Sequence, residues 1–129
     1  MRSDLLIAAL MAAGLAAPAL ASERIDPMSL KATGKPVRCI QNLNVNTTPA
    51  GDRVLMFRTS ANRWYRNELR GACPNMNGLN RMLVFRQAQS RHCEMDPFDV
   101  VEPQGAGMVL ASCTLGMFTP VEVPKGARF

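Results

Sequence analysis

The sequence is poor in the residues from which metal and redox sites are built. It has a single histidine, His92, and its four cysteines form no C-x-x-C pair. The usual zinc and copper sites need several converging histidine or cysteine ligands, and thioredoxin-type redox pairs and zinc ribbons need a C-x-x-C. No G-x-S-x-G or comparable nucleophile signature is present either. We therefore expect no metal ion, no cofactor and no catalytic residue.

Long hydrophobic runs are also lacking, except at the N-terminus. Residues 1–21 begin with Arg2, continue through an apolar stretch and end in Ala19-Leu20-Ala21. A charged start, a short apolar core and a small-x-small end are typical of a secretory signal peptide. We place the cleavage after Ala21 and expect a periplasmic or secreted protein. No later segment of the sequence has the length of a membrane span.

Export gives the four cysteines a structural meaning, because an oxidising compartment favours disulfides over free thiols. Cys39, Cys73, Cys93 and Cys113 allow two bridges in three possible pairings, and the sequence does not choose among them. We favour Cys73–Cys93, which would close the central loop, and Cys39–Cys113, which would tie the first strand to the last. On the loop-entropy model these would contribute roughly 3 and 4.5 kcal/mol.

Short apolar runs between turn residues predict a β domain. The expected strands are 37–41, 53–58, 63–67, 82–85, 98–102, 108–113 and 115–121. Turn chemistry separates them, as at residues 48–52, and no segment keeps a helical period. We predict one small, mostly β, disulfide-stabilised domain at 37–129, barrel-like or a sandwich of about five to seven short antiparallel strands. The polar residues 22–36 are expected to form a flexible lead-in.

Charge is unevenly distributed along the chain. Residues 53–91 contain eight arginines and one acidic residue, whereas residues 92–129 contain five acidic residues and two basic ones. This asymmetry indicates either an anion-binding face or arginines that pair with the acidic segment. An arginine fork binds phosphate through two parallel N–H donors, and aromatic rings add stacking. Six residues of the central hairpin form the predicted binding face: Arg58, Arg63, Trp64, Tyr65, Arg66 and Arg70.

We therefore expect a non-enzymatic exported protein whose basic central hairpin binds an unknown partner protein or an anionic component of the envelope. Lipid head groups and lipopolysaccharide phosphates are the candidate anions, and nucleic acid is not the expected partner. One alternative is an accessory subunit of an envelope complex. Another is an uncharacterised hydrolase that uses Glu94 and Asp96 with help from His92, since the two carboxylates could face one side of a strand. A turn in which Asp96 hydrogen-bonds to the backbone is the simpler interpretation.

Several motifs follow one another in order between residues 39 and 121. They are Cys39-Ile40, Asp52 before an apolar run, Asn67-x-Leu69, Cys73-Pro74, Cys93-x-x-Asp96 and Cys113-x-Leu115-Gly116-x-Phe118-x-Pro120. In this order they resemble a family of short exported proteobacterial proteins of unknown function. The resemblance implies an envelope location and a disulfide-bearing domain, and it brings no activity. His92 and the proline after Asp96 depart from the family pattern.

Overall fold

The computed structural model describes residues 13–15, 23–41, 43–86, 90–104 and 107–129, so most of the predicted signal peptide lies outside the described residues. Within them the chain forms nine short strands and one 3-10 helix, and no helix is long and apolar enough to cross a membrane. The elements are η1 (Pro27–Ser29), β1 (Cys39–Gln41), β2 (Asn46–Pro49), β3 (Val54–Arg58), β4 (Trp64–Glu68), β5 (Met82–Phe85), β6 (Arg91–Cys93), β7 (Pro97–Glu102), β8 (Met108–Thr114) and β9 (Phe118–Val121). The prediction of a small, mostly β domain is confirmed.

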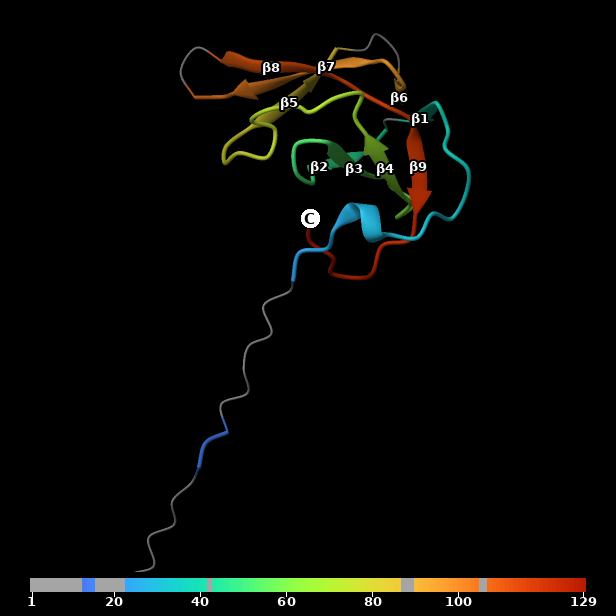
Figure 1. The fold of residues 1–129 in the computed structure, drawn as a ribbon, viewed down its shortest axis with the longest axis vertical. Helices are drawn as coiled ribbons and strands as arrows, with labels where there is room; N and C mark the ends of the chain where they lie inside the picture. The colour runs from blue at the N-terminus through green and yellow to red at the C-terminus, as the bar shows by residue number, and fades with distance from the viewer. Residues whose placement is uncertain (1–12, 16–22, 42, 87–89, 105–106) are drawn as a thin grey trace, which may run out of the picture.

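The strands form three antiparallel sheets arranged in layers (Figure 1). A three-stranded sheet, in the order β5-β7-β8, lies above a four-stranded sheet, in the order β2-β3-β4-β9. The two-stranded sheet β1-β6 lies at one side of both. The helix η1 and the C-terminal segment lie below the four-stranded sheet, so that this sheet is the middle layer.

The main core lies between the two larger sheets, because alternate residues of each strand point to the same face. Leu55 and Phe57 of β3 contribute from the middle layer, and Phe98 and Val100 of β7 contribute from the upper layer. Phe118 of β9 joins them, and all five side chains are fully buried. The rings of Phe57 and Phe118 pack edge to face with their centroids 5.2 Å apart, a favourable aromatic geometry.

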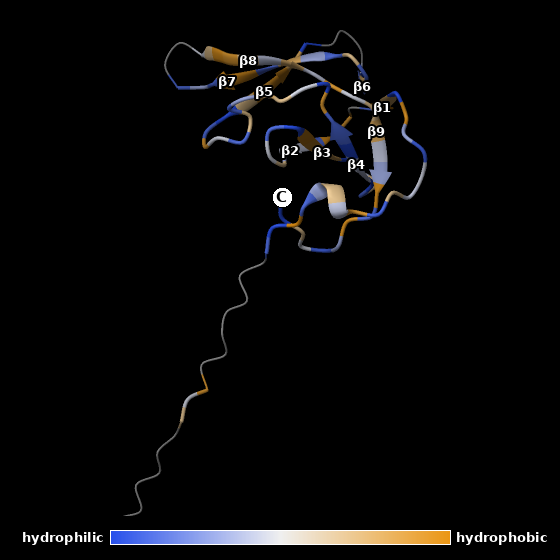
Figure 2. Cartoon of the chain, in the orientation of Figure 1, coloured by the Kyte–Doolittle hydropathy of each residue, from blue (hydrophilic) through white to orange (hydrophobic). Residues whose placement is uncertain are grey.

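A second apolar cluster lies on the other face of the four-stranded sheet. Val54 and Met56 of β3 pack there with Val121 of β9, and Leu30 and Phe129 cover them from the two ends of the domain. The strand β3 is therefore apolar on both faces, and Figure 2 shows it as an apolar strand beside the hydrophilic β4. The terminal segments complete the fold by covering this second face.

Residues 23–36, expected as a flexible lead-in, lie against the four-stranded sheet. The N–H of Thr33 donates to the carbonyl of Pro120 at 2.9 Å, and the N–H of Glu122 donates to the carbonyl of Lys31 at 3.0 Å. These are backbone hydrogen bonds along the edge strand β9, and such bonds leave no hydrophobic pattern in the sequence. The sequence did not predict that this segment would bind along β9, because the segment itself shows little hydrophobic periodicity.

The two strands absent from the prediction are β2 and β6. Thr48 and Pro49, expected in a turn, pair with Met56 and Leu55 as the end of β2. The turn follows them at Gly51, whose φ of +86° suits glycine. Because β2 is an edge strand, it tolerates proline. The strand β6 has only three residues, too few to show an alternating pattern.

All four cysteines form disulfides, but the predicted pairing is wrong. Cys39 bonds to Cys93, and Cys73 bonds to Cys113. The first bridge joins residues that are directly opposed in the β1–β6 ladder. The second joins the loop after β4 to β8, and Cys73 is fully buried in the main core. The prediction failed because it chose the partners from the positions of the cysteines along the chain. In the structure β6, which carries Cys93, pairs with β1, which carries Cys39.

Candidate anion-binding site

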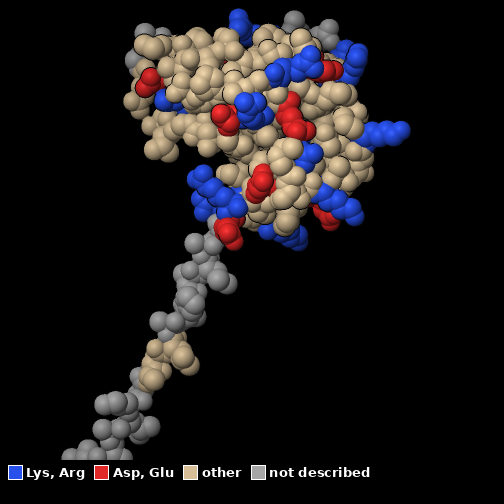
Figure 3. All heavy atoms as spheres, in the orientation of Figure 1, with Lys and Arg blue, Asp and Glu red and all other residues tan. Residues whose placement is uncertain are grey.

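The basic middle and the acidic end of the chain meet in space. Arg86 pairs with Asp99 at 2.9 Å, and Arg81 pairs with Glu102 at 4.0 Å, both across the β5–β7 ladder. Figure 3 shows acidic and basic side chains beside one another over the visible face of the domain. A large part of the charge asymmetry is therefore internal pairing, the second of the two interpretations that the sequence allowed.

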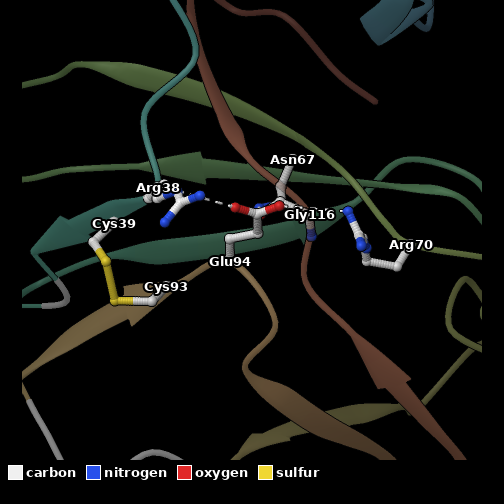
Figure 4. A network of polar contacts seen from close by, with 7 residues as sticks. All are labelled: Arg38, Cys39, Asn67, Arg70, Cys93, Glu94 and Gly116. Atoms are coloured by element: carbon white, nitrogen blue, oxygen red, sulfur yellow. Dashed lines mark hydrogen bonds and ion pairs between the residues drawn. A yellow bond between two sulfur atoms is a disulfide. The ribbon is translucent and has the colours of Figure 1, made fainter.

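Arg70, one of the six predicted binding residues, also belongs to such a pair. Glu94 lies between Arg38 and Arg70, with N–O distances of 3.7 and 3.4 Å (Figure 4). The side chain of Glu94 is 19% exposed, whereas those of Arg38 and Arg70 are 83% and 55% exposed. Exposed pairs of this kind contribute about 1 kcal/mol or less to stability. The guanidinium of Arg70 is therefore paired with the carboxylate of Glu94, and we exclude Arg70 from the candidate anion-binding face.

Arg66 lies two residues after Trp64 in β4, on the same face of the sheet, and points toward the η1 segment. Its Nη1 donates to the carbonyls of Pro27 and Leu30 at 3.1 and 3.3 Å, and its side chain is 11% exposed. Its Nε lies 4.0 Å from the carboxylate of Glu68 and makes no hydrogen bond within the described residues. Arg66 therefore fastens the η1 segment to the four-stranded sheet, which is a structural role.

The other four predicted residues gather at the tip of the β3–β4 hairpin. The Nε of Arg58 donates to the side-chain oxygen of Asn62 at 3.0 Å, and its guanidinium lies 5.8 Å from the centroid of the Trp64 ring. Arg63 is exposed, and Tyr65 follows Trp64 in β4. Among the described residues, neither Arg58 nor Arg63 takes part in an ion pair. Two guanidinium groups at this tip are thus available to an anion.

Two surface hollows meet at the same tip. The first, which we call hollow 1, has a volume of about 440 Å³ and extends from the hairpin tip to β1. The second, hollow 2, has a volume of about 350 Å³ and extends from the tip to β9 and Glu122. Arg63 and Tyr65 line both hollows. Both volumes fall within the range of about 300–1,000 Å³ that small-molecule sites occupy.

His92 belongs to the main core. It is 6% exposed, and its ring centroid lies 4.7 Å from that of Phe85 and 5.3 Å from that of Phe57. Burial lowers the pKa of His92 below its ordinary value, and the charge of Asp96 opposes this shift only in part. A neutral ring packed against two phenyl rings is not placed to act on a substrate.

The two carboxylates of the hydrolase alternative are engaged elsewhere. Asp96 accepts a hydrogen bond from the N–H of Cys93 at 2.7 Å, which confirms the simpler interpretation of a side chain that closes a turn. Glu94 is held between its two arginines. Each carboxylate therefore has a partner of its own, although the charge of Asp96 also acts on His92. Among the described residues, no group of three or more His, Cys, Asp or Glu side chains is arranged to hold a metal ion.

Comparison with known proteins gives a family for the chain. The model of a family of unknown function, DUF6491, matches residues 1–127. The chain belongs to this family. No curated protein and no solved structure matches it. Because DUF6491 carries no assigned activity, the function of this member has to be argued from its site.

Several residues of the sequence motifs between residues 39 and 121 have structural roles in this DUF6491 protein. Leu115 and Phe118, from the last motif, are fully buried in the main core. Asn67 is also fully buried and binds the backbone of Gly116. Asp96 closes the turn after β6. The hollows at the hairpin tip border other residues of these motifs, since Cys39 and Ile40 line hollow 1 and Pro120 lines hollow 2.

One wall of hollow 1 was not predicted from the sequence of this DUF6491 member. Gln41 and Leu43 line that wall, together with Thr59 and Ser60 of the hairpin turn. A short polar segment after β1 carries no signal that it will lie beside the hairpin tip. The exposure of Leu43, at 64%, is a feature that only the structure reveals.

Proposed function

We propose that this DUF6491 protein is an exported, non-enzymatic protein whose β3–β4 hairpin tip binds an anionic component of the cell envelope. The observation that carries the proposal is Arg63, an exposed arginine at the meeting of two hollows, with no ion pair among the described residues. Arg58 adds a second such guanidinium at the same tip. Charge-assisted hydrogen bonds from arginine are among the strongest that a protein offers to phosphate or carboxylate.

The proposed binding face is smaller than the six residues expected from the sequence. Arg66 is only 11% exposed and is bound to backbone carbonyls, and the charge of Arg70 is offset by the carboxylate of Glu94. The face consists of Arg58, Arg63, Trp64 and Tyr65. Its two aromatic residues point to opposite sides of β4, so that Trp64 lies beside Arg58 on one side and Tyr65 lies on the other.

Export is supported by the N-terminal sequence and by the disulfides. Two disulfides are typical of an oxidising compartment. Leu15, within the predicted leader, is 99% exposed and so contributes nothing to the core.

The intact mass of protein recovered from the periplasm or medium should correspond to a chain that starts at Ser22. A chain that keeps Met1 in those fractions would contradict the proposed cleavage.

Charge reversal at the tip tests the binding face. We expect Arg63→Glu to weaken retention on phosphatidylglycerol or lipopolysaccharide vesicles by about tenfold or more, because one charge-assisted contact is worth roughly 1.5–3 kcal/mol. The matched control is Arg53→Glu, which makes the same charge change at an exposed residue before β3, at the far end of the hairpin.

Two outcomes would count against the proposal. Equal losses in Arg63→Glu and Arg53→Glu would show that net charge alone, and not the tip, attracts the protein to anions. Wild-type protein that is not retained on either kind of vesicle at low salt would contradict anion binding altogether. Crosslinking in the intact envelope would then test the accessory-subunit alternative.

A further inference from the structure

The two hollows at the hairpin tip differ in charge. Hollow 2 includes the carboxylate residue Glu122, whereas hollow 1 is lined by Arg63 and by no acidic residue. A bound anion in hollow 2 would lie near a like charge, which is unfavourable. The anion that Arg63 attracts therefore belongs in hollow 1.

Neutral hydrogen-bonding groups line hollow 1 around Arg63. They come from Gln41, Thr59, Ser60 and Tyr65. The Oγ1 of Thr59 accepts a hydrogen bond from the N–H of Arg63 at 3.3 Å and keeps its own proton for donation. Hydroxyl and amide groups both donate and accept, so together they match a ligand whose own groups do the same. A ligand rich in hydroxyl groups has this property, whereas inorganic phosphate is too small to reach several of them at once.

Hollow 1 also has a limited apolar surface. Its apolar lining comes from Leu43, which is 64% exposed, and from Ala61, Cys39, Ile40 and Tyr65. Ile40 is already 94% buried by the core, as its exposed fraction of 6% shows, so little apolar area is left for a lipid chain. One flat aliphatic or aromatic patch beside polar groups fits the C–H face of a sugar ring, which is apolar while its rim is polar.

We infer that hollow 1 binds a saccharide that carries a phosphate or carboxylate group, with the anion on Arg63 and the ring against Tyr65 and Leu43. The inference rests on the proposed function, because it uses the same arginine, and it adds the class of ligand. The volume of about 440 Å³ suits one or a few sugar rings more closely than a folded macromolecule. The shared chemistry is found both in free sugar phosphates and in anionic glycans.

Titration of the disulfide-bonded protein, labelled with ¹⁵N, tests this inference. The probes are glucose 6-phosphate and a galacturonate tetramer, and glucose and inorganic phosphate serve as the two halves of glucose 6-phosphate. We expect both anionic sugars to shift the amide signals of residues 59–65 and to bind about tenfold or more tightly than glucose or inorganic phosphate alone. Stronger binding of the tetramer would point to a glycan, and stronger binding of glucose 6-phosphate would point to a free sugar phosphate.

Variants separate this inference from the proposed function. Ala61 is exposed and lines hollow 1, so Ala61→Trp should fill the hollow without changing charge. We expect this variant to lose the anionic sugars and keep the weaker binding of inorganic phosphate, whereas Arg63→Gln should lose both. Leu79→Trp is the control, because Leu79 is 89% exposed in a loop that borders neither hollow.

Each contrary result has a distinct meaning. If inorganic phosphate binds as tightly as glucose 6-phosphate, the saccharide inference is wrong while anion binding at Arg63 stands. If Ala61→Trp binds the sugars as wild type does, hollow 1 is not the site. If neither the sugars nor phosphate shift the tip, the inference and the proposed function both fail. Should Ala61→Trp disturb the hairpin, Gln41→Leu removes one neutral polar group instead and should weaken sugar binding about threefold or more.

Discussion

Asn67 and Gly116 hold each other through two hydrogen bonds between β4 and the segment that leads into β9 (Figure 4). The side-chain amide of Asn67 donates to the carbonyl of Gly116 at 2.8 Å, and the N–H of Gly116 donates to the side-chain oxygen of Asn67 at 2.8 Å. A Cβ at residue 116 would collide with the carbonyl oxygen of Glu68, so only glycine allows this approach. The pair fixes the entry to β9 and thereby the edge of the middle sheet.

Breaking this pair should be costly. We expect Asn67→Leu to lower the free energy of unfolding by about 2–5 kcal/mol, because both backbone groups of Gly116 would be left buried without a partner. Gly116→Ala should also destabilise, through the collision with Glu68. Urea unfolding measures both, and Asn77→Ala in an exposed loop is the control, expected within about 0.5 kcal/mol of wild type. A similarly small loss in Asn67→Leu would contradict the structural role.

Stability should fall on mild acidification because of His92. Burial lowers its pKa in the folded state, so the unfolded chain takes up a proton first as the pH falls below about 6.5. The free energy of unfolding should therefore decrease as the pH falls from about 7.5 to about 5.5. The contribution of His92 to stability is fully present above the pKa that this residue has in the unfolded chain. In His92→Phe, which keeps an aromatic ring, this decrease should vanish. A wild-type protein that gains stability over the same interval would show that the sign is wrong.

Peptide mapping without reductant should recover Cys39 linked to Cys93 and Cys73 linked to Cys113. Any other linkage would contradict the fold, because Cys39 and Cys93 lie directly opposite each other in the β1–β6 ladder. Loop entropy alone makes the two bridges nearly equal, at about 4 kcal/mol each. We expect loss of Cys73–Cys113 to cost more, since Cys73 is fully buried in the main core. Thermal unfolding of the two double Cys→Ala variants measures the order.

Arg66 should control the docking of the η1 segment. Its hydrogen bonds to Pro27 and Leu30 are charge-assisted and partly buried, a type worth about 1.5–3 kcal/mol each. In Arg66→Ala we expect the amide proton of Thr33, which is bonded to β9, to exchange about tenfold faster or more. Arg70→Ala, which breaks only the pair with Glu94, is the control and should leave Thr33 protected. Unchanged exchange in Arg66→Ala would contradict the fastening role.

Local patterns predicted those parts of the fold that depend on neighbouring residues. The strands β3, β5 and β7 were expected because their apolar runs and bounding turn residues lie within a few positions of one another. The docked segment 23–36 was not expected, because its partners are backbone groups of β9 far along the chain. For the same reason the wall of hollow 1 near Leu43 could not be placed.

The sequence by itself determined that the chain is a small β domain with its cysteines in disulfides and its arginines concentrated in the middle. Only the tertiary structure decided which cysteines bond and which arginines are available. Cys93 reaches Cys39 because β6 lies beside β1, and Arg70 is occupied because that same crossing brings Glu94 next to it. Disulfides and ion pairs act over a few ångströms, so distance in the folded chain, and not position along it, selects the partners and leaves Arg63 unpaired among the described residues.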